Sequence, residues 1–539
     1  MSRIVFVIIF VFLYHPYSRS QVLKHYDDFE LEWGELFRSS GNVEALLKTN
    51  DNQYFSLVNK TTVYNFFTDY KKRFYIEPIE AFEPQSRKKV KLIGDGKRTT
   101  LEDITTIDNQ LVAVSKKNFF WKKETGFYYH FIDPNLLSVE SRGFLLGRYN
   151  YTGSKNGFGY ISLTSDYNKN LAGIFYTIPS EGFDFPRYSF GVLNDHQELL
   201  YKNETTFPYR KKKLNFFDEY LTPSGDFFVL AREFTENNNS IWLNEEAQSQ
   251  IRVFKVEDGE LNNFKINQSE FILSEINVVS DENGNLIFSG LYSEDEFSGI
   301  HGVFFIKTDS EGEILNKEYH PFSVDFLNLG KSSWAKNRAL ENDFNGMPVD
   351  GLGNFVMHDL RKTSDNGYIG VAEHFEIEKR FSGVGTPGAS NRIDTYFFYD
   401  DILVYKLDSL GVLDWVKRIP KSQNSINDNG YYLSIVQALT DNHLFLLFND
   451  NSKNYDDLNY YLNLEFPKTA NFNFRKNTIA MTKINLEDGS INRFAIGGKN
   501  ELSTVLVPKL CIENRENNEL FLYSRSSNRQ RYGSILFKN

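Results

Sequence analysis

Ten polar residues in the second half of the chain have side chains suited to binding a polar or charged ligand. They lie in expected loops or near expected strand ends, where a rigid scaffold commonly carries binding groups. If they converge near one axis, they could hold a polar or anionic ligand. If their charged members pair with each other, they would instead fix neighbouring units of the fold. The candidates are Glu373, Asp401, Lys417, Arg418, Lys421, Gln423, Asp428, Asn449, Asp450 and Asn454.

Three of these residues are carboxylates that suggest a second chemistry. Glycoside hydrolysis uses a pair of carboxylates about 5 to 10 Å apart in a cleft. Glu373, Asp401 and Asp450 would be the candidates if they meet at the centre of the fold. Our first hypothesis is a binding or scaffolding protein without catalysis. The alternative is a glycan-active hydrolase.

Other chemistries have no support in the sequence. None of the nine His residues forms the close pairs typical of a zinc site. Acidic turns such as residues 281–284 lack the ligand spacing of a calcium loop. We therefore expect no metal and no cofactor. The net charge of −11 also argues against a nucleic-acid partner, because phosphate binding requires a basic surface.

The elements that must position these residues recur along the chain. From Gly41 onward, blocks of roughly 45 to 70 residues show four short strand patterns separated by polar or Asp/Gly turns. Residues 271–322 give the clearest block, with turns at 280–284 and 308–312. Similar blocks surround Thr222, Ser364 and Asp441, and weaker ones begin near Gly41, Thr100 and Gly157.

The last block and the first strand together predict a closed ring. Residues 504–537 have room for only three strands, and a lone strand near residues 29–37 would supply the fourth. We therefore predict an all-β fold, a single β-propeller of eight four-stranded blades, with seven as the alternative. Two or three β-sandwich domains are the competing interpretation, but no Pro/Gly/Ser-rich linker divides the chain.

One segment interrupts the repeat. Residues 324–350 contain a Ser-capped run rich in Ala, Leu, Lys and Arg, which predicts a short helix inserted between two blades. Such an insertion either shapes the mouth of the ring or serves as a spacer.

The N-terminus predicts export. Arg3, an apolar run over residues 4–14, and small residues at Ser18 and Ser20 are typical of a signal peptide spanning residues 1–20. The propeller would then occupy residues 21–539. No later stretch reaches the about 20 apolar residues of a membrane span, so we expect no transmembrane segment in the mature chain. Its partner would be an unknown protein or glycan.

Cysteine use is consistent with a bacterial envelope. Cys511 is the only cysteine, so no intrachain disulfide can form, whereas secreted animal proteins of this size usually carry them. We expect a periplasmic or extracellular protein.

Residues 401–454 resemble a known signature. The strings Asp401–Val404, Asp414–Gln423 and Phe448–Asn454 are similar to a recurring pattern in uncharacterised secreted proteins of Gram-negative bacteria. The resemblance implies an exported β-propeller-like protein. That family has no known activity to transfer.

Overall fold

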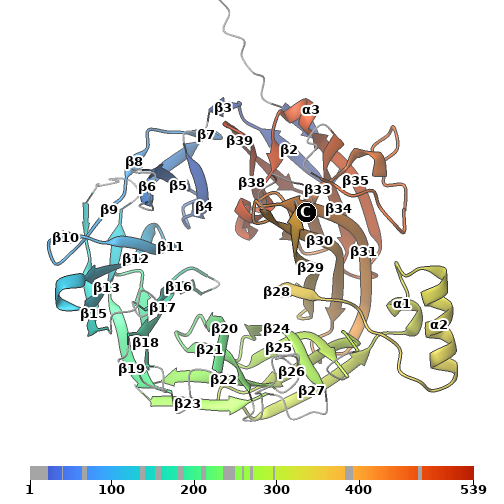
Figure 1. Cartoon of the computed structure of the whole chain (residues 1–539), viewed down its shortest axis with the longest axis horizontal. Helices are drawn as coiled ribbons and strands as arrows, with labels where there is room; N and C mark the ends of the chain where they lie inside the picture. Colours follow the sequence, from blue (N-terminus) through green and yellow to red (C-terminus); the bar gives the residue numbers. More distant parts are fainter. Residues whose placement is uncertain are drawn as a thin grey trace, which may run out of the picture.

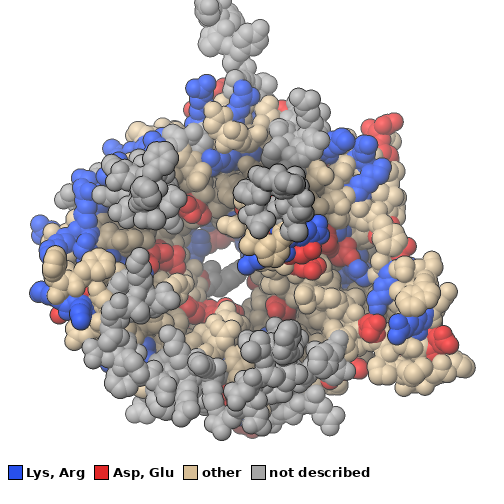
Figure 2. Space-filling view, in the orientation of Figure 1, with Lys and Arg blue, Asp and Glu red and all other residues tan. Residues whose placement is uncertain are grey.

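The computed structural model is a ring of β-sheets around a central channel (Figures 1 and 2). It describes residues 22–38, 41–63, 70–133, 140–151, 159–166, 168–179, 187–207, 214–234, 249–257, 260–266, 271–294, 298–382, 392–471 and 476–538. The predicted signal peptide, residues 1–20, lies outside the described residues.

Eight of the nine described sheets form the blades. Most are four-stranded antiparallel meanders whose first strand lies nearest the channel, as β16, β20 and β28 do in Figure 1. The first blade consists of β4 (Asn42–Lys48), β5 (Tyr54–Val63), β6 (Tyr70–Glu80) and β7 (Glu83–Pro84), with β8 (Lys88–Lys89) beside β6. The second consists of β11 (Thr100–Ile107), β12 (Gln110–Phe119), β13 (Glu124–Ile132) and β15 (Phe144–Asn150), and the third of β16 (Ile161–Ser165), β17 (Leu171–Ile178), β18 (Arg187–Asn194) and β19 (Leu199–Thr206). The fourth consists of β20 (Leu214–Leu221), β21 (Phe227–Phe234), β22 (Ser249–Glu257) and β23 (Glu260–Lys265).

The next three blades follow the same order. They consist of β24 (Ile272–Ser280), β25 (Leu286–Ser293), β26 (Gly302–Thr308) and β27 (Ile314–Pro321); β28 (Phe355–Lys362), β29 (Tyr368–Ser382), β30 (Arg392–Leu407) and β31 (Leu413–Ile426); and β32 (Val436–Leu439), β33 (His443–Asn451), β34 (Asn477–Asn485) and β35 (Ile491–Gly498). A small extra sheet joins β9 (Lys91–Gly94), β10 (Lys97–Arg98) and β14 (Glu140–Arg142).

The eighth blade joins the two ends of the chain. Its C-terminal strands are β36 (Val505–Leu506), β37 (Ile512–Asn514), β38 (Glu519–Ser526) and β39 (Arg529–Phe537); its N-terminal strands are β1 (Val22–His25), β2 (Phe29–Trp33) and β3 (Phe37–Arg38). β2 runs antiparallel to β39, from the pair Phe29 and Phe537 to the pair Trp33 and Gly533. The eight blades and the N-terminal closing strand confirm the sequence prediction.

Packing explains why β2 stays in the ring. Phe29, Leu31 and Trp33 alternate along the strand and are all buried to 1% exposure or less. Gly533 lies opposite Trp33, where a Cβ atom would approach the indole to 2.7 Å. The core of the propeller continues in this way between neighbouring sheets, with clusters of buried apolar residues drawn from adjacent blades.

The predicted Asp/Gly turns have a common hydrogen-bond pattern. Asp281 Oδ1 accepts from the amides of Asn283 and Asn285, both at 2.9 Å. Gly284 follows in the left-handed region at φ 79°, a conformation that glycine adopts readily. Asp309 and Asp408 make equivalent pairs of bonds. These carboxylates therefore serve to shape turns.

The insertion between β27 and β28 contains the predicted helix. α1 (Val324–Leu327) precedes α2 (Ser333–Phe344), whose first turn is capped by Ser332 accepting from the amide of Ala335 at 3.4 Å. α1 and α2 project beyond the outer edge of the ring and do not cover the channel in Figure 1. A third helix, α3 (Lys499–Leu502), follows β35. No helix among the described residues has the length and apolarity needed to span a membrane.

Candidate functional site

The structure divides the ten predicted residues into three groups centred on ion pairs, with two residues apart. Glu373 pairs with Lys421, and Asp401 pairs with Arg418. Asp450 pairs with Arg493, which the sequence analysis did not single out.

The first group is a buried pair between β29 and β31. Lys421 Nζ lies 2.7 Å from Glu373 Oε1, and both side chains are 1% exposed or less. Lys421 also donates to the carbonyl of Tyr399 at 2.7 Å and to Gln423 at 3.0 Å. Burial alone would raise the pKa of Glu373, but the charge of Lys421 and then the contacts of His358 lower it to about 2. Glu373 is therefore ionised at neutral pH and cannot act as a general acid there.

Two residues that the sequence analysis missed complete this group. His358 Nε2 lies 2.8 Å from Glu373 Oε2, and the Ser434 hydroxyl donates to the same oxygen at 2.7 Å. Ser434 has a φ of 79°, which is unusual for a residue with a side chain. Because its hydroxyl bonds the carboxylate and is 3.5 Å from the histidine, the arrangement is not that of an activated serine. His358 and Ser434 lie far apart in the sequence, so spacing gave no signal.

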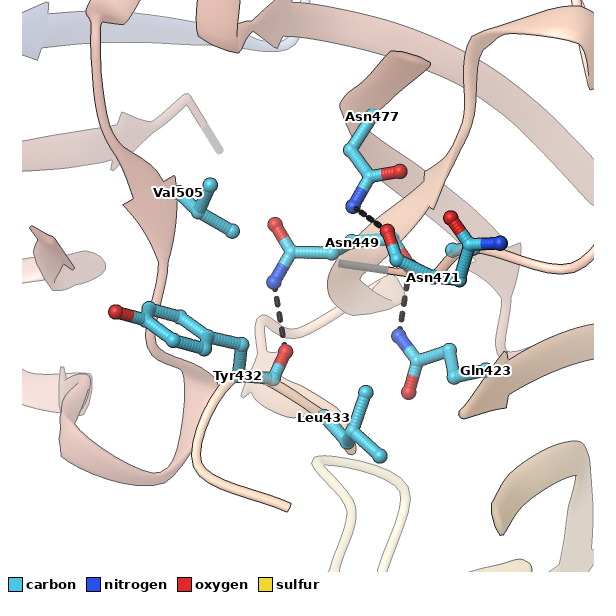
Figure 3. Close-up of a pocket in the computed structure, with 8 residues that line it drawn as sticks. Gln423, Tyr432, Leu433, Asn449, Asn471, Asn477 and Val505 are labelled. Carbon is cyan, nitrogen blue, oxygen red and sulfur yellow. Dashed lines mark hydrogen bonds between the residues drawn. The ribbon is translucent and has the colours of Figure 1, made fainter. Parts of the chain in front are cut away.

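Amide side chains continue the network into the next blade. Gln423 donates to the carbonyl of Asn449 at 2.7 Å, and Asn449 donates to the carbonyls of Tyr432 at 2.8 Å and Leu506 at 2.9 Å. Gln423, Tyr432 and Asn449 line a small cavity that has room for about one water molecule (Figure 3). The cavity is lined by Gln423, Tyr432, Leu433, Asn449, Ala470, Asn471, Asn477 and Val505. None of these side chains is charged, so the cavity supplies no acid or base.

The second group surrounds Asp450 on β33. Arg493 pairs with Asp450, and both side chains are at most 3% exposed. Asn454 donates to Asp450 Oδ1 at 2.9 Å and Tyr455 to Oδ2 at 2.7 Å. Arg493 Nη1 also donates to the carbonyl of Pro420 at 2.6 Å, at the neighbouring blade. Asp450 is thus fully engaged within the protein.

The third group lies on the outer part of its blade. Arg418, on the outermost strand β31, binds Asp401 and the carbonyl of Leu329, which lies between α1 and α2 in the helical insertion. Asp428 stands apart and accepts from Ser425 at 2.5 Å and from the amide of Gly430 at 3.0 Å. Lys417 also stands apart, close to Gly489 in a turn of the next blade. The predicted residues do not form one open site.

A different set of carboxylates lines the channel. The innermost strands β11, β20, β24 and β28 each carry a β-bulge that ends at an acidic residue, and β37 places a further carboxylate beside them. A bulge twists its strand and redirects side chains. Figure 2 shows acidic side chains at several points around the central opening. The carboxylates at the four bulges and on β37 are Asp103, Asp218, Glu275, Asp359 and Glu513.

Several of these carboxylates also join neighbouring blades. Asp103 accepts from the amide of Leu163 at 3.0 Å, and Glu275 accepts from the amide of Met357 at 3.1 Å. In both pairs the amide belongs to the innermost strand of the following blade. These two residues therefore contribute to holding the ring together, whatever else they bind.

One side of the channel has carboxylates without cations. Glu219 accepts from Ser162 and Thr164 on β16, both at 2.9 Å, while Asp103 approaches β16 from the other side. Burial raises the pKa of Asp103, Asp218 and Glu219 above the ordinary values. The charges of Asp218 and Asp103 raise the pKa of Glu219 further, and the charge of Asp359 raises that of Asp218. In the part of the chain that the structure describes, no basic side chain offsets these three charges.

The other side of the channel is neutralised. Arg361 on β28 pairs with both Asp359 and Glu513 at 2.5 Å. The amide of Gln437 on β32 donates to Asp359 at 3.3 Å. The three carboxylates with raised pKa values, Asp103, Asp218 and Glu219, therefore lie on β11 and β20, away from Arg361. These residues are hard to recognise from the sequence, because single acidic residues in half-buried strands resemble ordinary solvent-facing positions.

Comparisons with known proteins report only remote likeness. No protein-family model and no curated protein matches the chain. Among solved structures, the WD40 domain of SCAP from fission yeast is 8% identical with a TM-score of 0.42, covering 96% of this chain and 98% of that chain.

Two further structures were found at similar levels. Polysaccharide lyase Uly1 is 10% identical with a TM-score of 0.37, covering 82% of this chain and 90% of that chain. The β-propeller domain of the Trilobed protease from Pyrococcus furiosus is 10% identical with a TM-score of 0.34, covering 84% and 98%. At such scores these likenesses say nothing about activity.

Proposed function

We propose that the protein is a binding propeller whose channel receives a positively charged group, such as a Lys or Arg side chain of a partner protein. One observation carries this proposal. Asp103, Asp218 and Glu219 lie together on one side of the channel, partly exposed, with raised pKa values and no cation among the described residues.

The electrostatics favour a cationic ligand over an anionic one. Burial makes the ionised forms of Asp218 and Glu219 unfavourable, and the charge of Asp359 adds to the cost for Asp218 as those of Asp218 and Asp103 do for Glu219. An incoming cation would reduce these costs. A cleft lined with charges of one sign also focuses the field and raises the local concentration of the opposite charge. The cations predicted from sequence, Arg418 and Lys421, are already paired and do not compete.

Glycan hydrolysis is the second candidate, and it now depends on different residues. A general acid needs a raised pKa and access to substrate. Glu373, Asp401 and Asp450 are each paired with a cation, whereas Asp103 and Glu219 have raised pKa values. A hydrolase would therefore use the same channel carboxylates as the proposed binding site.

Calorimetry on the folded chain with tetralysine and with spermidine tests the binding proposal. We expect binding that weakens as salt is raised, because screening reduces the attraction between exposed charges. The double variant D218N/E219Q should lose most of the affinity. Glu282→Gln removes one charge at a side chain that is 83% exposed in a surface turn, where it pairs with Lys362, and serves as a control for loss of surface charge away from the channel.

Two results would count against the proposal. Equal affinity of the D218N/E219Q variant and the Glu282→Gln control would show that the ligand binds elsewhere. Release of reducing ends from a polysaccharide by the native chain, abolished by Glu219→Gln alone, would instead favour hydrolysis.

We also propose that the protein acts outside the cytoplasm, in the periplasm or beyond the cell. The predicted signal peptide and the presence of a single cysteine support this compartment. N-terminal sequencing of the protein expressed in a Gram-negative host should find Gln21 as the first residue of an exported form. An uncleaved protein confined to the cytoplasm would contradict the proposal.

A further inference from the structure

The tip of the β12–β13 hairpin presents two aromatic side chains to solvent. The tip is a short 3-10 helix, Phe120–Lys122, between the two strands. Trp121 is 102% exposed and Phe120 is 66% exposed. Exposed apolar residues scattered singly are common on proteins, but adjacent large aromatics at the end of a projecting hairpin indicate a contact surface.

The base of this tip is held firmly. The ring of Phe119 lies 5.6 Å from Lys97 Nζ and 4.8 Å from the guanidinium carbon of Arg148. Arg148 is paired in turn with Asp95. The amide of Tyr151 donates to the carbonyl of Lys123 at 2.8 Å. The exposed aromatics therefore project from an ordered support.

Basic side chains surround the aromatics. In the same hairpin and the neighbouring strands β10 and β15 there are seven Lys and Arg residues but only one carboxylate, Glu124, with Asp95 in the turn before β10. Figure 2 shows basic side chains gathered along this part of the ring, which Figure 1 labels β9, β10, β13 and β15. The basic residues are Lys97, Arg98, Lys116, Lys117, Lys122, Lys123 and Arg148, of which Lys116 pairs with Glu102 and Arg148 with Asp95. This local excess contrasts with a net charge of −11 for the whole chain.

We infer that this Trp121 tip, residues 117–123 with Lys97, Arg98 and Arg148, docks on the surface of an anionic lipid bilayer. Tryptophan is favoured at the boundary between water and lipid, where its ring is apolar and its N–H meets polar headgroups. Lysine and arginine beside it are attracted to anionic headgroups. The two features occur together here and use no residue of the channel, so this inference is independent of the proposed function.

The shape of the tip favours a bilayer over a nucleic acid. Single-stranded nucleic acids bind in basic grooves where successive bases stack on several aromatic platforms. Here the aromatic pair stands at the end of a projecting hairpin, with the cations around its base. A projecting tip of this kind can insert its end into a planar interface while its flanks remain in water.

Sedimentation with lipid vesicles tests the inference on the full mature chain. We expect binding to vesicles with about one third phosphatidylglycerol or phosphatidylserine, at least about tenfold weaker binding to pure phosphatidylcholine, and loss of binding at high salt. Trp121→Ala should weaken binding by about tenfold through loss of the interfacial ring. The double variant K122Q/K123Q should weaken it by at least as much and reduce its dependence on salt.

Trp334→Ala provides the matched control. Trp334 is 71% exposed on α2, and the helical insertion lies on the opposite side of the ring from the tip in Figure 1. We expect this variant to bind vesicles as the native chain does. All variants should keep the native melting temperature, because the substituted side chains are exposed.

A second measurement localises the contact directly. Lipids brominated along their acyl chains should quench part of the tryptophan fluorescence of the native chain and of Trp334→Ala, but not of Trp121→Ala. The inference is overturned if neither vesicle type binds, if Trp334→Ala and Trp121→Ala lose equal affinity, or if soluble DNA competes with vesicles at equal charge concentration.

Discussion

Lys421 and Glu373 form an ion pair of 2.7 Å that is almost completely enclosed by two blades of the ring. Burying such a pair costs desolvation free energy, and removing only one partner destabilises the protein strongly. The hydrogen bonds of Lys421 to Gln423, and of Gln423 to Asn449, extend this pair from β31 to β33. The pair therefore couples two sheets that contribute separately to the ring.

Removing one partner of this pair should destabilise the protein strongly. We expect Lys421→Met to lower the free energy of unfolding by about 3 to 5 kcal/mol, because it leaves an uncompensated buried carboxylate. The double variant K421M/E373L should recover much of that loss. Urea unfolding measures both variants. Equal losses in the single and the double variant would show that the charge pair itself is not the cause.

The same pair predicts acid sensitivity. The pKa of Glu373 is lowered from its ordinary value of 4.5 to about 2 in the folded protein. A lowered carboxyl pKa contributes stability that is present above pH 4.5 and is lost as the pH falls towards 2, by about 3 kcal/mol in total. Urea midpoints from pH 7 to pH 2 should therefore fall more steeply for the native chain than for K421M/E373L.

The channel carboxylates predict a pH dependence of stability with the opposite sign. Burial and the charge of Asp359 raise the pKa of Asp218, so its ionised form destabilises the folded state at neutral pH. Asp218→Asn should raise the melting temperature at pH 7, and the gain should shrink as the pH falls below the carboxyl range. The backbone N–H of Glu219 donates to Asp218 Oδ1 at 2.9 Å, and it can still donate to the side-chain oxygen at position 218 in this variant. A lower melting temperature at pH 7 would contradict the assignment.

A disulfide across the closing strands should stabilise the ring. Glu30 and Leu536 are directly opposite in the β2–β39 ladder and lie on its solvent side, so E30C/L536C satisfies the distance that a disulfide requires. In a Cys511→Ala background we expect a gain of about 4 kcal/mol in the oxidised form, since a very long loop is closed. Melting with and without reductant measures it. Equal melting temperatures with and without reductant would mean that unfolding begins at another part of the ring.

The sequence was sufficient to predict the repeat and its closure. Alternating apolar residues such as Phe29, Leu31 and Trp33 indicate a half-buried strand wherever they occur, and Asp281 with Gly284 specifies a turn by local hydrogen bonds. These signals are local, so they can be recognised in the sequence without knowing which strands pair. The preferred count of eight blades followed from them, but the additional short strands of the first and last blades and the small sheet of β9, β10 and β14 did not.

The candidate site could not be predicted in the same way. Whether Asp450 meets Arg493, or Lys421 meets Glu373, depends on the register of strands more than 40 residues apart. The polar types were recognised, but their partners were not. The predicted residues mostly pair within the protein, as one of the two interpretations expected, while Asp103 and Asp218 stood out only once the bulges of the inner strands were known.

The pairing of β2 with β39 constrains the order of assembly. The strand that leaves the ribosome early must wait for the last strand of the chain before its buried face has a partner. Until then Phe29 and Trp33 remain available to chaperones or to other chains. Translation and folding therefore cannot finish blade by blade, and a chain interrupted near its end would keep an open, adhesive edge at both termini.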